Sequence, residues 1–258
     1  MIKKTEKNNA TSIGIIGGLG PETSCLFSLK IISEIRKLLN EQPNILLENL
    51  AVSNEVEKLI IEGGNSLKIL NLLANSVKRL NKAKVDFIVI PCNTVHTFID
   101  TLRDLSAVPI VSIIEETAKE CKRKKIKKVG ILASTKTIKE GLHEKELRKF
   151  DISIISPSDK EQKILCNIIR NIIHKKETIE DKKRALEIIK NLHLSGADAI
   201  ILGCTDLFHL LKEDSASFNF VDTFSVFISS VVKLFLENSQ IRNIPKKCEE
   251  LQIRRNKK

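Results

Sequence analysis

Short apolar runs alternate with longer segments of helical periodicity along most of the chain. Glycine, proline and polar residues bound the apolar runs, which is typical of buried strands. Strands are predicted at residues 12–16, 45–52, 87–90, 110–113, 128–132, 152–155 and 199–202. Helices are predicted at about 26–35, 67–80, 139–150, 159–174, 179–194 and, after a loop that starts at 221, up to 236. This alternation predicts βα units and an α/β fold with parallel sheets.

Two segments of the first half of the chain recur in the second half. Residues 85–94 (VDFIVIPCNT) match residues 197–206 (ADAIILGCTD) as an acid, an apolar strand, one turn residue, a cysteine and a polar pair. Residues 12–17 (SIGIIG) match residues 128–133 (KVGILA). The cysteines Cys92 and Cys204 are 112 residues apart, and the glycines Gly14 and Gly130 are 116 apart. The identities are few, which leaves a chance match open, but the shared order favours a duplicated α/β domain.

The 258 residues are enough for two domains, each with its own core. We expect a basic N-terminal tail over residues 1–11, a first α/β domain over 12–120 and a second over 121–225. Residues 226–258 are predicted to form a C-terminal helix, which returns to the first domain, and a basic tail. Packed as a pseudo-symmetric pair, the two domains would have the active site between them.

The formal charge is +11, with basic runs at residues 122–128 and 246–258. Tyr and Trp are absent, and no aromatic residue for base stacking lies within the basic run at 122–128. We therefore expect no nucleic-acid partner, although the basic runs keep that alternative open. No apolar run approaches the length of a membrane span, and the N-terminus lacks the apolar part of a secretory signal. These features predict a cytoplasmic protein without a membrane partner.

Six cysteines are scattered singly along the chain, with no CxxC pair. In a cytosolic protein this pattern is typical of reduced thiols. No two Cys or His residues have the spacing of metal ligands, so no metal site is predicted. The cysteines interpreted as buried structural residues are Cys25, Cys121, Cys166 and Cys248.

Cys92 and Cys204 each follow a predicted strand, at the edge where open α/β sheets bind ligands. Two thiols on opposite sides of one carbon suit an inversion of configuration: one thiolate removes a proton and the opposite thiol delivers another. The glycine loop 17–20 and the polar residues after each cysteine are candidates to stabilise the carbanion. His96 either tunes the Cys92 thiol or packs against the following helix.

Several segments resemble signatures of the aspartate/glutamate racemase family, and of its aspartate racemase branch in particular. They are GGLGP at 17–21, PCNTVH at 91–96, SIIEET at 112–117, GILASTKTI at 130–138 and GCTDL at 203–207. The resemblance extends from about residue 13 to 238. It implies racemisation of an acidic amino acid, aspartate in first place, without PLP or another cofactor, and often a homodimer.

The same resemblance implies roles for individual residues. Cys92 and Cys204 fall on the two catalytic cysteines. Substrate-binding roles are expected for Gly18, Leu19, Lys58, Asn93, Thr94, Ser134, His174 and Thr205.

Three positions depart from the aspartate racemase pattern. Lys58 stands where that branch carries an Arg for the side-chain carboxylate, so the charge is kept but the bidentate fork is lost. His174 stands where a Lys is common, and Asp206 follows Gly-Cys-Thr in place of Glu. The alternatives are therefore a glutamate or hydantoin racemase, a maleate isomerase, a decarboxylase, or a catalytically silent amino-acid-binding protein.

Overall fold

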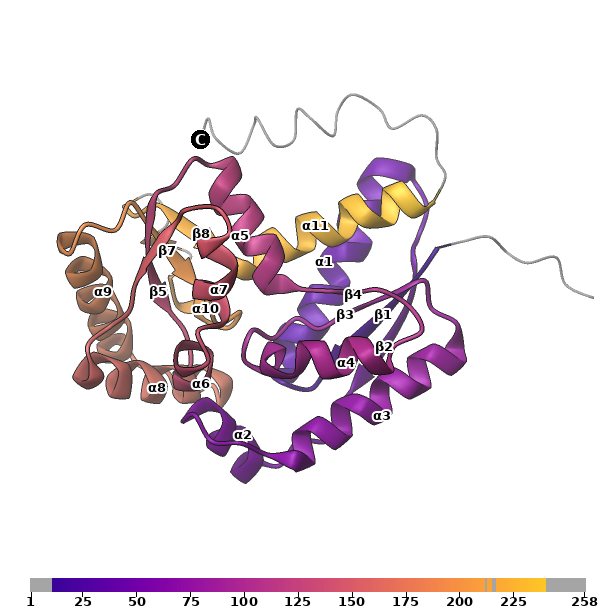
Figure 1. The fold of residues 1–258 in the computed structure, drawn as a ribbon, viewed down its shortest axis with the longest axis horizontal. Helices are drawn as coiled ribbons and strands as arrows, with labels where there is room; N and C mark the ends of the chain where they lie inside the picture. The colour runs from indigo at the N-terminus through magenta and orange to yellow at the C-terminus, as the bar shows by residue number, and fades with distance from the viewer. Residues whose placement is uncertain (1–10, 212, 215–216, 240–258) are drawn as a thin grey trace, which may run out of the picture.

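The computed structural model describes residues 11–211, 213–214 and 217–239, which form two four-stranded sheets with helices on their faces (Figure 1). The first sheet has the order β2-β1-β3-β4, with β1 (Ser12–Gly17), β2 (Asn44–Asn49), β3 (Phe87–Val89) and β4 (Ile110–Val111). The second has the order β6-β5-β7-β8, with β5 (Lys128–Leu132), β6 (Ser153–Ile155), β7 (Ala199–Leu202) and β8 (Phe220–Asp222). Every pairing is parallel, which confirms the predicted fold class.

The helices of the first half of the chain are α1 (Pro21–Leu39), α2 (Asn54–Ile61), α3 (Leu67–Ala83), the 3₁₀ helix η1 (Thr94–Phe98), α4 (Ile99–Leu105) and α5 (Ile113–Arg123). Those that follow are α6 (Thr135–Lys139), α7 (Leu142–Arg148), α8 (Asp159–Ile173), α9 (Ile179–Leu194), α10 (Leu207–Leu211) and α11 (Thr223–Asn238). The predicted long helices at 67–80, 159–174, 179–194 and up to 236 all correspond to observed ones.

The predicted helix 139–150 is wrong, because α6 and α7 replace it. Gly141 lies between them with a φ of 60°, a left-handed conformation that ends one helix before the next begins. The predicted strand 110–113 is also too long, since the Ser112 hydroxyl accepts a hydrogen bond from Glu115 N–H and starts α5 there. Cys25, interpreted from the sequence as a buried structural residue, is exposed on α1, whereas Cys121 and Cys166 are buried as predicted.

The two matched sequence segments occupy equivalent positions in the two sheets. Gly14 of β1 pairs with Ile88 of β3, and Gly130 of β5 pairs with Ile200 of β7. An aspartate stands just before each of the two strands that lead to a cysteine, β3 and β7, and it makes the same contact in both sheets. The carboxylate of Asp86 accepts the N–H of Ser12, and that of Asp198 accepts the N–H of Lys128. Shared topology, register and side-chain contacts support a duplicated unit.

Helix α11 starts directly after β8 and packs against the first half of the chain, next to α1 (Figure 1). The ring of Phe227 stacks on that of Phe27 with 5.3 Å between centroids, in one apolar cluster with Ile13 of β1. This helix therefore joins the two sheets. The predicted basic tails and Cys248 lie, except for Thr11, outside the described residues. Within the described ranges, no helix has both the length and the apolar character needed to cross a bilayer.

Candidate active site

Cys92 and Cys204 lie just beyond the carboxyl ends of β3 and β7, the equivalent strands of the two sheets. Both line one cavity of about 40 Å³ between the two halves of the chain. The first half contributes Leu19, Glu57, Ile60, Ile61, Cys92, Asn93, Thr94 and Val95, and the second half contributes Ser134, Ile169, Ile173, Cys204, Thr205 and Asp206. The structure thus brings together the two cysteines and Leu19, Asn93, Thr94, Ser134 and Thr205 of the predicted binding residues.

The Cys92 thiol is held against the start of η1. Burial raises its pKa to about 11, and the carboxylates of Asp206 and Glu57 act in the same direction. The backbone N–H groups of Val95 and Thr94 oppose this increase, because they donate to the sulfur and stabilise the thiolate. At neutral pH Cys92 is therefore a protonated thiol, with two backbone N–H donors placed to stabilise its thiolate.

Cys204 has a carboxylate as its partner. Its Sγ donates to Asp206 Oδ2 over 3.6 Å, and Thr23 Oγ1 donates to Asp206 Oδ1 over 2.5 Å. Burial, followed by the negative charge of Asp206, raises the pKa of Cys204 well above its ordinary value. Burial also raises the pKa of Asp206, while the bonds from Thr23 and Cys204 lower it. Thr23, Asp206 and Cys204 form one hydrogen-bonded chain that fixes the direction of the thiol.

Hydroxyl groups connect the two halves beside the cysteines. Thr94 Oγ1 lies 2.9 Å from Ser134 Oγ, which lies 3.0 Å from Thr137 Oγ1. Thr205 Oγ1 donates to the backbone carbonyl of Pro91 over 3.3 Å. Thr94, Ser134 and Thr205 also line the cavity, so their hydroxyls are placed to meet the polar groups of a ligand.

The side chain of Asn93 is fully buried and already engaged at both ends. Its Oδ1 accepts from His143 Nε2 over 3.0 Å, and its Nδ2 donates to Thr223 Oγ1 over 3.1 Å. These partners belong to α7 and to the start of α11. The Asn93 amide therefore ties the Cys92 loop to the second half of the chain, and the residue also lines the cavity.

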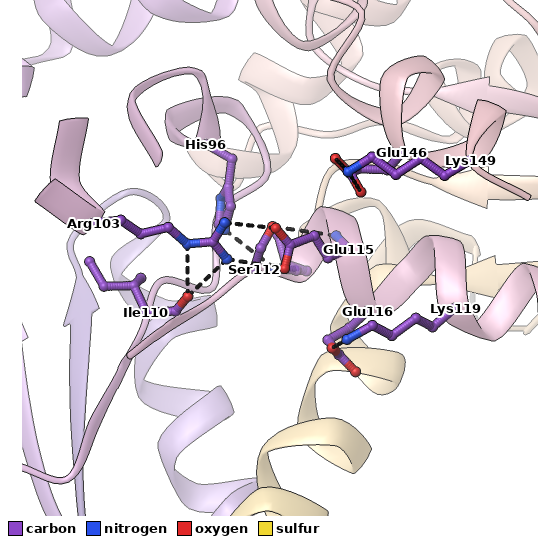
Figure 2. A network of polar contacts seen from close by, with 10 residues as sticks. His96, Arg103, Ile110, Ser112, Glu115, Glu116, Lys119, Glu146 and Lys149 are labelled. Atoms are coloured by element: carbon purple, nitrogen blue, oxygen red, sulfur yellow. Dashed lines mark hydrogen bonds and ion pairs between the residues drawn. The ribbon is translucent and has the colours of Figure 1, made fainter. Parts of the chain in front are cut away.

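His96 bridges the Cys92 loop and α5. Its Nδ1 donates to the carbonyl of Cys92 over 2.8 Å, and its Nε2 accepts the N–H of Ile113 over 3.3 Å. Burial lowers its pKa to about 4, so the ring is neutral and acts in positioning. Figure 2 shows the adjoining network, in which Arg103 of α4 binds the Glu115 carboxylate with two nitrogens, at 2.7 and 3.0 Å.

Gly18 shapes the loop without lining the cavity. Its φ of 88° is left-handed, and a Cβ at this position would collide with the backbone of Leu50. The turn thereby directs Leu19 into the cavity.

Besides Gly18, two more of the predicted binding residues lie outside the cavity lining. Lys58 is exposed on α2 and is not part of the cavity lining. His174, the C-cap of α8, is 36% exposed at the rim, with Nε2 3.5 Å from Glu57 Oε2. Glu57 lines the cavity and contacts His174, but it was not singled out as a binding residue from the sequence. Residues three and four positions apart share one face of a helix, so Ile60 and Ile61 place Glu57 on the inner face of α2. This spacing is the sequence feature that could have identified Glu57.

The fold and the cavity define a class of protein: two related parallel α/β units with a small-molecule site between them. Comparison with known proteins gives the family. Residues 16–231 match the family described as Asp/Glu/Hydantoin racemase, so the chain belongs to that family.

Characterised relatives and solved structures agree with this family. The chain is 27% identical over 240 residues to the broad specificity amino-acid racemase RacX of Bacillus subtilis, covering 87% of this chain and 98% of the relative. It is 29% identical over 232 residues to a glutamate racemase of Buchnera aphidicola, covering 84% of both chains. A structure of an aspartate racemase homologue from Pyrococcus horikoshii superposes with a TM-score of 0.69 at 26% identity, covering 87% of this chain and 99% of that one.

Proposed function

We propose that this chain is an amino-acid racemase that works without PLP and uses Cys92 and Cys204 as its two acid/base groups. The observation that carries the proposal is that both thiols line one cavity from equivalent strand ends. Membership of a racemase family and the broad specificity racemase among its relatives support the reaction class.

In this reaction, one thiolate removes the α-proton of the substrate and the opposite thiol donates a proton to the other face of the carbon. The charge that develops passes into the substrate carboxylate, to which the hydroxyls of Thr94 and Ser134 can donate hydrogen bonds. The product leaves with one proton exchanged, and the two sulfurs have swapped protonation states. Reversal of their roles converts the other enantiomer.

The raised pKa values of both cysteines require that a thiolate be formed before proton abstraction. The ammonium group of a bound amino acid supplies a positive charge beside the sulfurs and favours that anion. For Cys204, the Asp206 carboxylate accepts the thiol hydrogen bond and fixes the direction of the sulfur. For Cys92, the N–H groups of Thr94 and Val95 stabilise the thiolate.

The identity of the substrate is a separate question. The sequence predicts aspartate, with Lys58 holding its side-chain carboxylate, but Lys58 is exposed and outside the cavity lining. The experiment therefore tests acidic amino acids as one group of substrates among several.

The test is to incubate the purified protein with single L-amino acids in D2O without PLP, following α-deuteration by NMR and the D-enantiomer by chiral chromatography. We expect both signals in the wild type, and loss of racemisation in Cys92→Ser and in Cys204→Ser. Cys25→Ser is the matched control, because Cys25 is exposed and lies away from the cavity.

Full racemisation in either cavity variant would overturn the two-thiol assignment. Silence with acidic, basic and neutral amino acids, together with measurable ligand binding, would favour the silent binding protein. A homodimer and a cytoplasmic location remain predictions from the family resemblance and the sequence. Size-exclusion chromatography with light scattering tests the dimer.

A further inference from the structure

We propose that the cavity selects amino acids with a cationic side chain, and that the Glu57 carboxylate binds the ammonium or guanidinium group. The proposal rests on the racemase function proposed above and names its substrate class. It departs from the acidic substrate that the sequence predicts.

The cavity lining contains well buried polar residues and one less buried acid. Asn93, Ser134 and Thr205 are at most 3% exposed. Glu57 of the lining and His174, which contacts Glu57 from outside the lining, have side chains exposed to 14% and 36%. A cavity of about 40 Å³ has room for roughly three water molecules, comparable to the amino, carboxylate and α-carbon groups of a substrate. With these groups at the cysteines, a longer side chain extends towards Glu57.

The lining around Glu57 is rich in aliphatic side chains. Ile60 and Ile61 of α2 and Ile169 and Ile173 of α8 line the same cavity as Glu57. Aliphatic walls suit the methylene groups of a long side chain, whose burial is favourable. The Glu57 carboxylate beside these aliphatic side chains matches an apolar stem that carries a terminal positive charge.

Both charged residues of the cavity lining are acidic. The lining carries the carboxylates of Glu57 and Asp206, and none of its described residues is Lys, Arg or His. Burial raises the pKa of Glu57, the charges of Asp206 and Glu22 raise it further, and the neighbouring charge of His174 lowers it. Lys175, the next basic residue along the chain, is paired with Glu22 at 3.0 Å. A substrate carboxylate here would meet two like charges, whereas a cationic group would neutralise Glu57.

The test measures binding to wild-type protein by isothermal titration calorimetry, with L-lysine, L-norleucine and L-glutamate as ligands. Lysine and norleucine have nearly the same shape and differ in the terminal charge. We expect lysine to bind more tightly than norleucine, and glutamate to bind more weakly than either. Glu57→Gln should weaken lysine binding about 10- to 100-fold, the usual effect of losing a bond to a charged group, and leave norleucine binding unchanged.

Glu55→Gln is the matched control. Glu55 and Glu57 share the first turn of α2, so each substitution removes the same favourable charge at the helix N-terminus. Glu55 is exposed and not part of the cavity lining, so its variant should bind lysine as the wild type does. Unchanged norleucine binding by Glu57→Gln shows that the site is still folded.

Equal binding of lysine and norleucine, tighter binding of glutamate, or equal loss in the Glu55 and Glu57 variants would overturn this proposal. The binding measurement does not depend on turnover. Racemisation with glutamate as the preferred ligand would refute the substrate class alone. Lysine binding that depends on Glu57, without α-proton exchange of any amino acid, would refute the racemase function alone.

Discussion

Thr205, the residue after Cys204, donates its hydroxyl hydrogen bond to the carbonyl of Pro91, the residue before Cys92, over 3.3 Å. The two cysteine loops are therefore joined by a direct contact between their neighbours, across 114 residues of chain. The bond fixes how the loops lie relative to each other, and with them the two thiols.

Thr205→Val keeps the shape of the side chain but removes its donor. We expect kcat to fall about tenfold, because small displacements of catalytic groups are costly, with a modest change in KM. The free energy of unfolding should fall by about 1 kcal/mol, the usual worth of one buried hydrogen bond. Steady-state kinetics and urea denaturation measure both effects.

Thr205→Ser restores the donor and should recover most of the activity. If the valine variant keeps the wild-type kcat, the bond between the loops has no part in placing the thiols.

Local pattern was enough to predict seven of the eight strands and to single out the two cysteines that line the cavity. The segment from residue 221 was predicted to begin as a loop, but the structure has β8 (Phe220–Asp222) there, followed directly by α11. Apolar runs bounded by turn residues define β1, β3, β5 and β7, and the match between residues 85–94 and 197–206 singles out Cys92 and Cys204. The equivalent pairings Gly14–Ile88 and Gly130–Ile200 explain why that match appears: the two segments fill the same place in duplicated sheets.

Other features of the site could not be predicted from short segments of sequence. Adjacent residues on a helix point about 100° apart, so the choice between Glu57 and Lys58 depends on the phase of α2. That helix has eight residues and was not predicted. The contacts of Thr23 with Asp206 and of Asn93 with His143 join residues 183 and 50 positions apart. Only the packing of the two halves creates them.

Buried histidines should make the protein less stable in mild acid. Burial, followed by the nearby His96, lowers the pKa of His143 to about 3, so the folded state holds this ring neutral. In the unfolded chain its pKa is about 6.5. As the pH falls from 6.5 towards 3, the unfolded state binds a proton that the folded state does not, and stability is lost. The maximum slope is about 1.4 kcal/mol per pH unit for this residue.

His143→Gln removes the titration and keeps a donor for Asn93 Oδ1, which His143 Nε2 now supplies. We expect a shallower loss of unfolding free energy in the variant than in the wild type between pH 6.5 and 4.5. Urea denaturation at four pH values gives both slopes. His96 is present in the wild type and in the variant, so its contribution to the pH slope of the unfolding free energy is the same in both. Parallel slopes would mean that His143 is not held neutral in the folded protein.

The charge of Asp206 should govern the reactivity of both cavity thiols. Its carboxylate lies 3.6 Å from Cys204 Sγ, and it raises the pKa of Cys204 and also that of Cys92. Asp206→Asn removes this charge, so the pKa of each thiol should fall and the thiolate fraction at a given pH should rise. A lower pKa also makes a thiolate a weaker nucleophile, which offsets about half of the gain. We therefore expect alkylation by iodoacetamide at pH 8 to speed up about threefold per unit of pKa.

Mass spectrometry of the alkylated peptides measures each thiol separately, and exposed Cys25 serves as an internal control that should react equally in both proteins. The increase should be larger at Cys204 than at Cys92, because Asp206 accepts a hydrogen bond from Cys204 as well as acting through its charge. Slower alkylation of Cys204 in the variant would reverse the interpretation of Asp206. It would then act as the base that deprotonates Cys204, and its loss would remove the proton acceptor that is hydrogen-bonded to this thiol.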